Sequence, residues 1–406
     1  MDKFYDLGVR PPLGTVPKTM LACCIRKDRY GTPATAMQME RVPVPEILGD
    51  HDVLIYVMAA GINYNGIWAS SGVPVDVIRH CKRFGEDNDY FIPGSEGSGI
   101  VWKKGAAVTD LNVGDEVVVS VMTWDSSDPD IIAGLEPENS PSYRVLGYER
   151  NGTFAQYVRV NAAQCVKKPI DISWLESAGS LGGIAFVHKM ICGQSGMELK
   201  ENDPVLVWGG AGTVGLNTLK ICNHYGARAI AVVSNQEKAE FCKEMGAHGV
   251  IDRSKFAHWG RLPEINDDNA THAWMKEMKA FAKAFYEALG EKRNPRIVVE
   301  HPGEDTLPTS IFMVDRHGMV VICGATTGYY ASLDLRYLWM RAKRLQGCHG
   351  FDAQDVQTAI DLVQGNDFDL EPSRTFSLAE TGNAHQMMLD NKIPTGNMVV
   401  AVNVLD

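Results

Sequence analysis

The chain has no long apolar run and no excess of basic residues, and these absences exclude several classes of protein. No apolar segment approaches the length of a membrane span, and residues 1–18 lack the apolar core of a signal peptide. The formal net charge of -11 gives no reason to expect binding to nucleic acid or to an anionic membrane, because both favour basic surfaces. At 406 residues, 45% of them hydrophobic, the sequence predicts a globular protein of two or three domains.

Cysteine is also used sparingly. The nine cysteines are scattered singly apart from Cys23 and Cys24, and no C-x-x-C pair occurs. An odd number of dispersed cysteines in a long chain argues against a disulfide framework. We therefore expect reduced thiols and a cytoplasmic location.

A glycine-rich stretch, Pro204 to Leu216, is the strongest local signal. Val205 to Trp208 predict a short buried strand, four glycines then form a tight turn, and a helical pattern begins at Leu216. Backbone N–H groups at such a helix start can bind a pyrophosphate. The spacing is G-x-x-G-x-x-G rather than G-x-G-x-x-G, so an ordinary glycine turn is the alternative. The predicted cofactor contacts here are Gly209, Gly212, Thr213, Val214 and Gly215.

The next predicted strand, 229–233, is not followed by a carboxylate. It ends in Ser234, and Lys238 and Arg253 lie further along the chain. NAD-specific folds place an Asp or Glu at this point to bind the ribose hydroxyls, whereas a hydroxyl and nearby cations suit a 2′-phosphate. The pattern favours NADPH, although either cation can equally be a surface charge. We add cofactor contacts at the ends of later strands, and these are His301, Cys323 and Gly324.

The order of predicted elements indicates an α/β fold built from two kinds of domain. Short apolar runs broken by Gly, Asp and Pro predict a β-rich domain over 1–182, with turns at 94–99 and 113–117. Alternating strands and helices predict a Rossmann-type doubly wound parallel sheet over 183–359, with an insertion around 254–290. Residues 360–406 are expected to return to the first domain. Ser173 and Glu176 have the spacing of a capping box and predict a helix start.

A basic cluster follows in the otherwise acidic chain. One interpretation is a solvated basic face, and the other is an anion site for a coenzyme A thioester, with an aromatic ring stacked on adenine. The residues assigned to this site are Arg336, Tyr337, Arg341, Lys343 and Arg344, with Tyr329 as the alternative stacking ring. His349 closes the segment.

Zinc chemistry is not supported by the residue types present. Alcohol dehydrogenases of similar layout hold zinc with Cys, His and a carboxylate. This chain has Asn63-Tyr64-Asn65 where such enzymes carry a Cys, and Ser95-Glu96 where they carry His-Glu. Because zinc sites require clustered thiolate or imidazole ligands, we predict no metal.

Several motifs resemble those of crotonyl-CoA carboxylase/reductases, within the medium-chain dehydrogenase/reductase superfamily. The matching stretches span nearly the whole chain, and the most distinctive are RYLWM (336–340) and EHPG (300–303). The others include PPLGTVPK (11–18), MAAGINYNGIW (58–68), GYERNGTFAQY (147–157) and TGNMVV (395–400). The resemblance implies that the β-rich domain is GroES-like.

The resemblance also implies a reaction and a site. NADPH would deliver hydride to Cβ of an α,β-unsaturated acyl-CoA, and the resulting enolate would attack CO2 at Cα. Members of the family bind CO2 with an Asn, a Phe-Glu pair and a His, which fall on Asn65, Tyr148, Glu149 and His349. The Glu149 carboxylate is expected to orient the His349 imidazole, directly or through water. Relatives assemble as tetramers built from dimers, so a homotetramer is expected.

The chain departs from the family pattern at three places. Position 148 is Tyr where Phe is usual, His349 is followed by Gly350-Phe351-Asp352 rather than Phe-Ala-Asn, and residues 182–186 differ from the usual run. The alternatives are an enoyl-CoA reductase that protonates the enolate, a zinc-free quinone or enone reductase, and a non-enzymatic NADPH-binding protein. The basic cluster argues against the quinone reductase.

Overall fold

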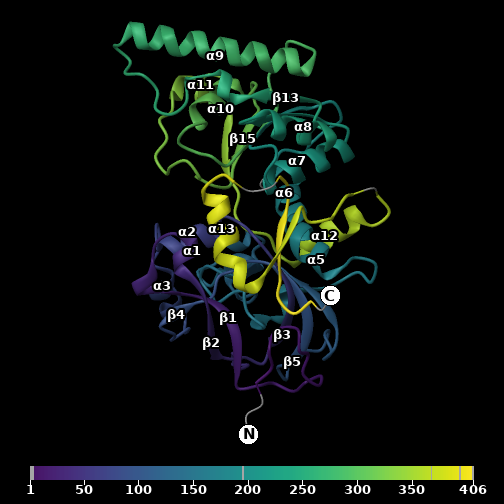
Figure 1. Ribbon diagram of the computed structural model, residues 1–406. Helices are drawn as coiled ribbons and strands as arrows, with labels where there is room; N and C mark the ends of the chain where they lie inside the picture. The colour runs from purple at the N-terminus through teal and green to yellow at the C-terminus, as the bar shows by residue number, and fades with distance from the viewer. Residues whose placement is uncertain (1–3, 194–195, 367, 393–394, 405–406) are drawn as a thin grey trace. The chain divides into compact units, whose positions relative to one another are not determined.

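The computed structural model describes residues 4–193, 196–366, 368–392 and 395–404. It divides into two compact units (Figure 1), which we call unit 1, Met1–Ala185 with Gly350–Asp406, and unit 2, Phe186–His349. The sequence-based boundaries lie at 182 and 359. Across the described ranges, no helix is both long and apolar enough to cross a membrane.

Unit 1 is built on a seven-stranded sheet in which β3 is the central strand. β3 (Asp52–Gly61) is buried along all ten residues because it pairs with β5 and β9 and, through its end, with β18. Two smaller sheets, β2-β1-β4 and β7-β8, complete the unit. The other strands are β1 (Thr19–Arg26), β2 (Met37–Pro43), β4 (Tyr90–Phe91), β5 (Gly97–Lys104), β6 (Glu116–Val119), β7 (Met122–Thr123), β8 (Arg144–Val145), β9 (Tyr157–Asn161), β10 (Cys165–Lys167), β17 (Arg374–Ser377) and β18 (Met398–Ala401).

The helices of unit 1 are short. The predicted capping box is confirmed at α5 (Trp174–Glu176), where the Ser173 hydroxyl accepts from the Glu176 N–H and the Glu176 carboxylate accepts from the Ser173 N–H. A π-helical turn, Ser177–Leu181, then leads into α6 (Gly182–Cys192). The remaining helices are α1 (Pro33–Ala36), α2 (Asn65–Ser71), α3 (Val77–Arg83), α4 (Pro129–Ile132), α12 (Ala353–Val363) and α13 (Thr381–Leu389).

Unit 2 contains a six-stranded sheet in the order β13-β12-β11-β14-β15-β16. All five pairings are parallel, and by position in the chain the order is 3-2-1-4-5-6, which is that of a doubly wound dinucleotide-binding fold. The predicted fold class is therefore confirmed. The strands are β11 (Pro204–Trp208), β12 (Arg228–Val233), β13 (Gly249–Asp252), β14 (Ile297–Glu300), β15 (Met319–Ile322) and β16 (Arg344–Gly347).

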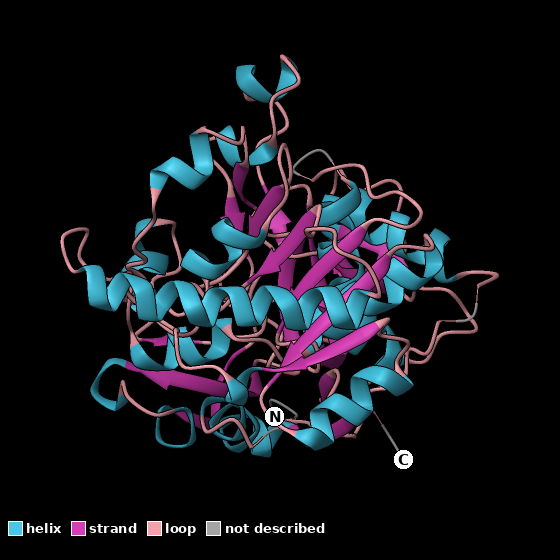
Figure 2. Cartoon of the chain, turned by 90° about the horizontal axis from the view of Figure 1, so that it is seen from above, coloured by secondary structure: helices cyan, strands magenta, loops and turns pink. Residues whose placement is uncertain are grey.

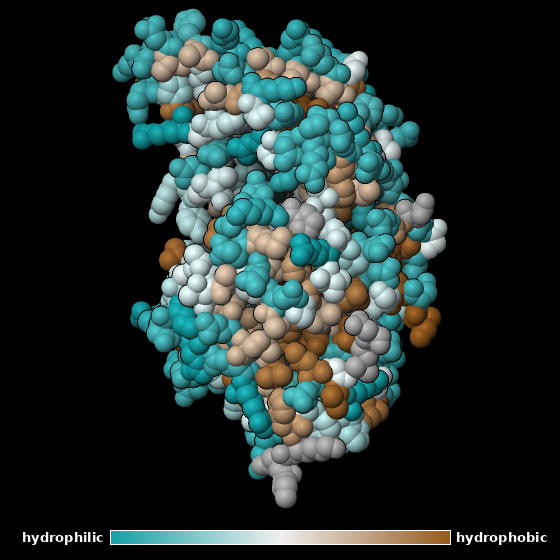
Figure 3. Space-filling model, in the orientation of Figure 1, coloured by the Kyte–Doolittle hydropathy of each residue, from teal (hydrophilic) through white to brown (hydrophobic). Residues whose placement is uncertain are grey.

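The segment predicted as an insertion contains the long helix α9 (Asp268–Leu289), which Figure 2 shows running across strands of the sheet. Met278, Phe281 and Phe285 are buried on its inner side and pack with alternate residues of β11 and β12. The outer side is mainly hydrophilic (Figure 3). The other helices of unit 2 are α7 (Thr213–His224), α8 (Gln236–Glu244), α10 (Leu307–Met313) and α11 (Leu335–Trp339).

Three sequence-based boundaries need correction. Helix α7 begins at Thr213 rather than Leu216, so Gly215 lies inside its first turn. A Cβ there would lie 2.4 Å from the Gly209 carbonyl oxygen, so packing rather than turn formation explains this glycine. Two stretches interpreted as turns, Gly94–Gly99 and 113–117, instead run into β5 and β6. Glycine within a strand is tolerated where another backbone approaches closely, as Tyr56 does at Gly99.

Candidate active site and cofactor site

The glycine turn of unit 2 has the geometry needed to hold a pyrophosphate. Gly209 adopts a left-handed conformation with φ of 58°, which allows the chain to turn directly after β11. Gly212 is the N-cap of α7 and supplies no side-chain cap. A Cβ at Gly212 would meet only the Gly209 carbonyl oxygen, 3.6 Å away, so the helix start is left open. The turn therefore fits the predicted dinucleotide.

The residues predicted to recognise a 2′-phosphate follow the next two strands. Ser234 follows β12 directly, and Asn235 caps α8 by accepting from the Lys238 N–H at 2.9 Å. Burial lowers the pKa of Lys238, whereas the neighbouring Glu237 raises it. The Arg253 guanidinium lies over the Trp259 ring and 3.8 Å from Asp305. These groups suit a phosphate, and no carboxylate stands at the end of β12.

His301, Cys323 and Gly324 lie at the carboxyl ends of β14 and β15, as expected. The His301 Nε2 is 3.0 Å from the Trp208 carbonyl oxygen, and burial lowers the pKa of this histidine to about 4. The Cys323 thiol points to the Glu300 carbonyl oxygen at 3.8 Å. Gly324 passes close to His301, since a Cβ there would lie 3.2 Å from its carbonyl oxygen. All three positions therefore adjoin the glycine turn side of the sheet.

In unit 1, Asn65 is the first residue of α2. Its backbone N–H donates to the Asn63 Oδ1 at 3.2 Å, and its side-chain Nδ2 donates to the Ser95 Oγ at 3.2 Å. Tyr64, the formal N-cap, makes no side-chain cap. Asn63 therefore takes over the capping of α2 and fixes the Asn65 backbone, while Ser95 holds the Asn65 side-chain amide.

Tyr148 and Glu149 lie in the tight turn after β8. The N–H groups of both residues donate to the Val145 carbonyl oxygen, and Glu149 Oε2 accepts from the Val145 N–H at 2.8 Å. Glu149 Oε1 lies 3.1 Å from Nε2 of His80 on α3. Sequence reasoning missed His80. Its place inside the apolar pattern of a short helix gives no signal that it faces a glutamate sixty-nine positions away.

Asn65 and the Tyr148–Glu149 turn meet on the same segment of unit 1. Ser95 accepts the Asn65 amide, and a Cβ at Gly147 would lie 2.3 Å from the Gly94 carbonyl oxygen and 2.8 Å from the Ser95 nitrogen. The turn thus packs directly on Gly94 and Ser95. Three of the four predicted CO2-binding residues therefore lie on segments of unit 1 that contact Gly94 or Ser95.

The fourth, His349, is the last residue of unit 2. Its carbonyl oxygen accepts from the Lys189 Nζ at 3.4 Å. The prediction that Glu149 orients His349 stays a prediction, whereas the partner of Glu149 inside unit 1 is His80.

The basic cluster occupies α11 and the strand that follows it. The Arg336 guanidinium pairs with Asp334 at 2.7 Å and is mostly exposed. Tyr337 packs edge-on against Phe312, with ring centroids 5.0 Å apart. Lys343 donates to the carbonyl oxygens of Ile311 and Phe312, and burial lowers its pKa to about 8. Lys343 thus stabilises the end of α10, while the arginines remain exposed.

A buried carboxylic acid, Glu96, stands beside the Asn65 site. Its Oε1 accepts from the Asn63 Nδ2 at 3.3 Å, and its Oε2 has no hydrogen-bond partner within the described part of the chain. Burial raises the pKa of Glu96 from 4.5 to about 7, against the smaller effect of the Asn63 hydrogen bond. Sequence reasoning treated Glu96 only as a remnant of a zinc motif.

The donor set around Glu96 does not fit zinc. An amide (Asn63) and a hydroxyl (Ser95) stand where zinc enzymes of this layout carry Cys and His, and neither is a good zinc ligand. Among the residues that the structure describes, no three His, Cys, Asp or Glu side chains are grouped to hold a metal. The absence of zinc stays a prediction, and no step below uses a metal.

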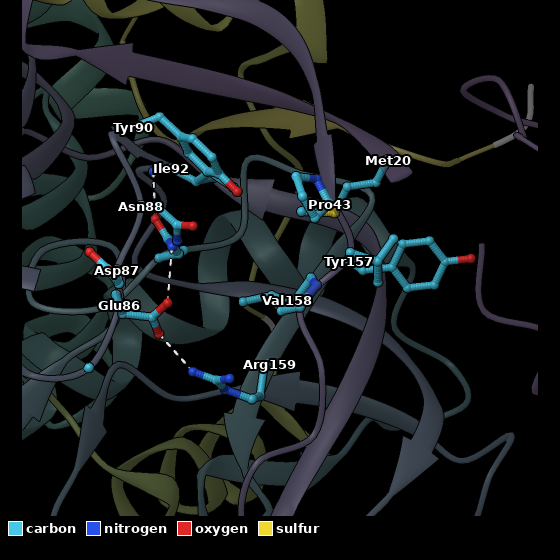
Figure 4. A pocket seen from close by; sticks show the side chains of 15 residues that line it. Met20, Pro43, Glu86, Asp87, Asn88, Tyr90, Ile92, Tyr157, Val158 and Arg159 are labelled. Atoms are coloured by element: carbon cyan, nitrogen blue, oxygen red, sulfur yellow. Dashed lines mark hydrogen bonds and ion pairs between the residues drawn. The ribbon is translucent and has the colours of Figure 1, made fainter. Parts of the chain in front are cut away.

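A separate pocket of about 190 Å³ lies in unit 1 (Figure 4). Glu86 stands in its wall, with Oε1 2.9 Å from the Arg159 Nη2 and Oε2 accepting from the Asn151 Nδ2 at 3.2 Å. Met20, Pro43 and other apolar residues form much of the remainder. None of the predicted catalytic residues lines this pocket.

The comparisons with known proteins agree with these features. Residues 49–170 match the alcohol dehydrogenase GroES-like domain, and residues 213–365 match the zinc-binding dehydrogenase profile. The crotonyl-CoA carboxylase/reductase of Cereibacter sphaeroides is 43% identical over 98% of this chain and 91% of its own length. The chain belongs to the crotonyl-CoA carboxylase/reductase family. This confirms the family predicted from the motifs.

Solved structures of the family have the same fold. The crotonyl-CoA carboxylase/reductase AntE in complex with NADP is 47% identical, covers 99% of each chain and superposes with a TM-score of 0.93. The 2-octenoyl-CoA carboxylase reductase CinF in complex with NADP and 2-octenoyl-CoA is 29% identical over 97% of this chain and 89% of its own, with a TM-score of 0.88. A further relative, from Streptomyces collinus, is named crotonyl-CoA reductase and is 32% identical over 91% of this chain and 85% of its own.

Proposed function

We propose that this enzyme catalyses NADPH-dependent reductive carboxylation of a short α,β-unsaturated acyl-CoA, of the crotonyl-CoA to ethylmalonyl-CoA type. The observation that carries the proposal is the 43% identity, over nearly the full chain, to a crotonyl-CoA carboxylase/reductase. The open glycine turn before α7 supports the cofactor. The predictions of an oxidoreductase, of NADPH and of this reaction agree with the names of the relatives.

The residues of the chain have separate roles in this proposal. When bound, NADPH supplies the hydride that reduces Cβ of the thioester. The Asn65 amide carries two N–H groups, of which Ser95 accepts one, and the other is directed to an oxygen of CO2. This hydrogen bond strengthens as CO2 becomes a carboxylate, so it favours the transition state over the bound gas.

The turn at 148–149 and His349 complete the proposed carboxylation site. Glu149 is held by His80 and by the Val145 N–H, so its position is fixed before substrate arrives. Tyr148 forms an aromatic wall that keeps water, and therefore protons, from the enolate. His349 is proposed as a second donor to CO2.

We propose that the exposed arginines Arg336, Arg341 and Arg344 bind the phosphates of coenzyme A, with Tyr337 or Tyr329 stacked on adenine. Exposed guanidinium groups suit polyphosphate because they pair with its oxygens through two hydrogen bonds at once. Lys343 contributes by holding α10 beneath this surface.

We also propose that the enzyme is a homotetramer and works in the cytoplasm. Strand β16 ends the sheet of unit 2 and is exposed along all four residues, and Trp339 beside it is 70% exposed. An uncovered sheet edge next to exposed apolar side chains is a surface that another subunit can cover. The nine cysteines all lie in the described residues and form no disulfide there, which suits a reducing compartment.

An enoyl-CoA reductase that protonates the enolate is the second candidate. Tyr148 favours it because a phenolic hydroxyl adds a polar group to a wall that carboxylation needs dry. The relative from Streptomyces collinus carries the name of a reductase alone.

The deciding experiment measures NADPH oxidation with crotonyl-CoA, with and without bicarbonate and carbonic anhydrase, and identifies the acyl-CoA formed. Ethylmalonyl-CoA as the main product at saturating CO2 is the expected result. Butyryl-CoA as the main product at saturating CO2 would overturn carboxylation and establish the reductase. No oxidation of NADPH with any short enoyl-CoA would overturn both.

A further inference from the structure

Glu96 is fixed at both its backbone and its side chain. Its carbonyl oxygen accepts from the Gly61 N–H at 3.3 Å and from the Thr153 hydroxyl at 2.8 Å. These contacts tie the residue to the end of β3 and to the segment that leads into β9. The side chain therefore has a defined direction.

Two glycines make the space that the Glu96 carboxyl occupies. A Cβ at Gly182 would lie 1.8 Å from Oε2, and a Cβ at Gly61 would lie 2.7 Å from the Cγ of Glu96. The Phe351 ring closes the same side, 2.8 Å from the Cβ position of Gly182. The carboxyl thus fills a slot that no larger residue at 61 or 182 would leave, and it is shielded from water.

The side chain of Asn63 links the Glu96 carboxyl to Asn65. Asn63 donates its Nδ2 to Glu96 and accepts the Asn65 N–H on its Oδ1. The two ends of an amide are chemically different, so these contacts select one of its two orientations. From Asn65 the connection returns through Nδ2 to Ser95, the residue before Glu96.

The underside of this turn is closed by a second buried residue. His385 on α13 is fully buried, and a Cβ at Gly66 would lie 2.3 Å from its Nε2. Its Nδ1 is 2.8 Å from the Thr381 carbonyl oxygen, so its ring is held in place. The start of α2 therefore packs against a ring that is held in place, and the Asn63 side chain joins this start to Glu96.

We propose that Glu96 is a positioning residue that acts through Asn63 to fix the start of α2, and with it the backbone from which the Asn65 side chain reaches toward CO2. The inference rests on the proposed function and assigns it a residue that lies outside the CO2-binding set. The acid form is the one that serves this role, because a neutral carboxyl adds no negative charge beside the carboxylate that forms. The high pKa of Glu96 agrees with this.

The test compares the product ratio, ethylmalonyl-CoA to butyryl-CoA, at limiting CO2. Glu96→Ala removes the acceptor for Asn63, and we expect the ratio to fall about five- to tenfold, as befits one lost orienting hydrogen bond. Glu96→Gln keeps a neutral acceptor at Oε1, and the ratio should stay within about twofold of the wild type. A purely structural role would lower total activity and stability without changing the ratio.

Glu86→Ala is the matched control, because Glu86 is a glutamate of unit 1 whose carboxylate is bonded to Asn151 and Arg159 rather than to Asn63. Its product ratio should equal that of the wild type. Asn63→Ala removes the donor of the same hydrogen bond. Its product ratio tests the inference if Glu96→Ala does not fold.

The outcomes separate the inference from the function on which it rests. A wild type that carboxylates, together with an unchanged ratio in Glu96→Ala or Asn63→Ala, would overturn the positioning role alone. The same would follow from an equal fall in Glu86→Ala. A wild type that gives only butyryl-CoA would overturn the proposed function and this inference with it.

Discussion

In the described part of each unit, burial raises the pKa of one glutamate, but the hydrogen bonds of the two carboxyls differ. In unit 2, Glu300 accepts three hydrogen bonds, from the Gly303 N–H at 3.1 Å and from the hydroxyls of Thr306 at 2.6 Å and Ser310 at 2.5 Å. In unit 1, Glu96 accepts one, from Asn63, and its Oε2 has no partner in the described residues. Burial raises the pKa of both to about 7.

The difference separates a structural hydrogen-bond network, at Glu300, from a candidate functional group, at Glu96. The three donors to Glu300 stand at the start of α10, so its carboxyl joins the end of β14 to the next helix. Ser310 in turn accepts the Trp208 indole N–H at 2.8 Å, which extends the network into the core. A complete network of this kind stabilises a fold, whereas an incomplete one has capacity left for function.

The largest effect is expected at Glu300. Glu300→Ala leaves two hydroxyls and one N–H without their acceptor in a fully buried place, so the free energy of unfolding should fall by about 3 kcal/mol or more. Chemical denaturation measures this loss. Glu96→Ala, which leaves one amide unpaired, should lose only about 1 kcal/mol. Equal losses of unfolding free energy in the two variants would show that the two carboxyls stabilise the fold equally.

A second, smaller effect concerns pH. The carboxyl of Glu96 releases its proton near pH 4.5 in the unfolded chain and near 7 in the folded one. Between these values the folded state holds a proton that the unfolded state has lost, so stability is full below about pH 4.5 and falls as pH rises through 7. Glu96→Gln does not titrate.

The variant should therefore gain about 2 to 3 kcal/mol relative to the wild type between pH 5 and pH 8. Denaturation curves of both proteins at the two pH values measure this gain, and Glu300 contributes equally to each. A difference between variant and wild type that does not change with pH would show that Glu96 is already ionised in the folded protein.

The same contrast explains what could be predicted from the sequence. The donors to Glu300 all lie within ten positions of it in the sequence, and the EHPG stretch was already singled out as a motif. The parallel sheet of unit 2 and the strand before the glycine turn follow from local alternation of apolar runs, and these predictions are confirmed. Local patterns are sufficient because each strand and its helix are neighbours in sequence.

The surroundings of Glu96 come from distant parts of the chain and could not be predicted in this way. Gly61, Asn63, Gly182 and Phe351 meet only after the sheet of unit 1 has formed. The pairing of Glu149 with His80 is of the same kind. The resemblance to a family supplied Asn65 and Glu149, but no local pattern indicates the side chains that hold them.

The smallest expected effect tests whether a buried group with unsatisfied hydrogen-bonding atoms always marks a functional site. His258 in unit 2 is 6% exposed, both of its ring nitrogens lack a partner in the described residues, and it packs among Trp259, Trp274 and Phe281. Burial lowers its pKa from 6.5 to about 4. The unfolded state therefore takes up a proton below pH 6.5 before the folded state does, and stability is lost as pH falls toward 4.

The stability of His258→Phe relative to the wild type should be about 2 kcal/mol higher at pH 5 than at pH 8. The kinetics of the variant toward crotonyl-CoA should be unchanged. His272→Phe on the exposed side of α9 is the control, and its difference in stability from the wild type should be the same at both pH values. A loss of activity in His258→Phe would mean that unsatisfied atoms of a buried side chain mark a functional site in unit 2 as well. With activity retained, an unpartnered atom marks function only where, as at Glu96, its neighbours lead to a reacting group.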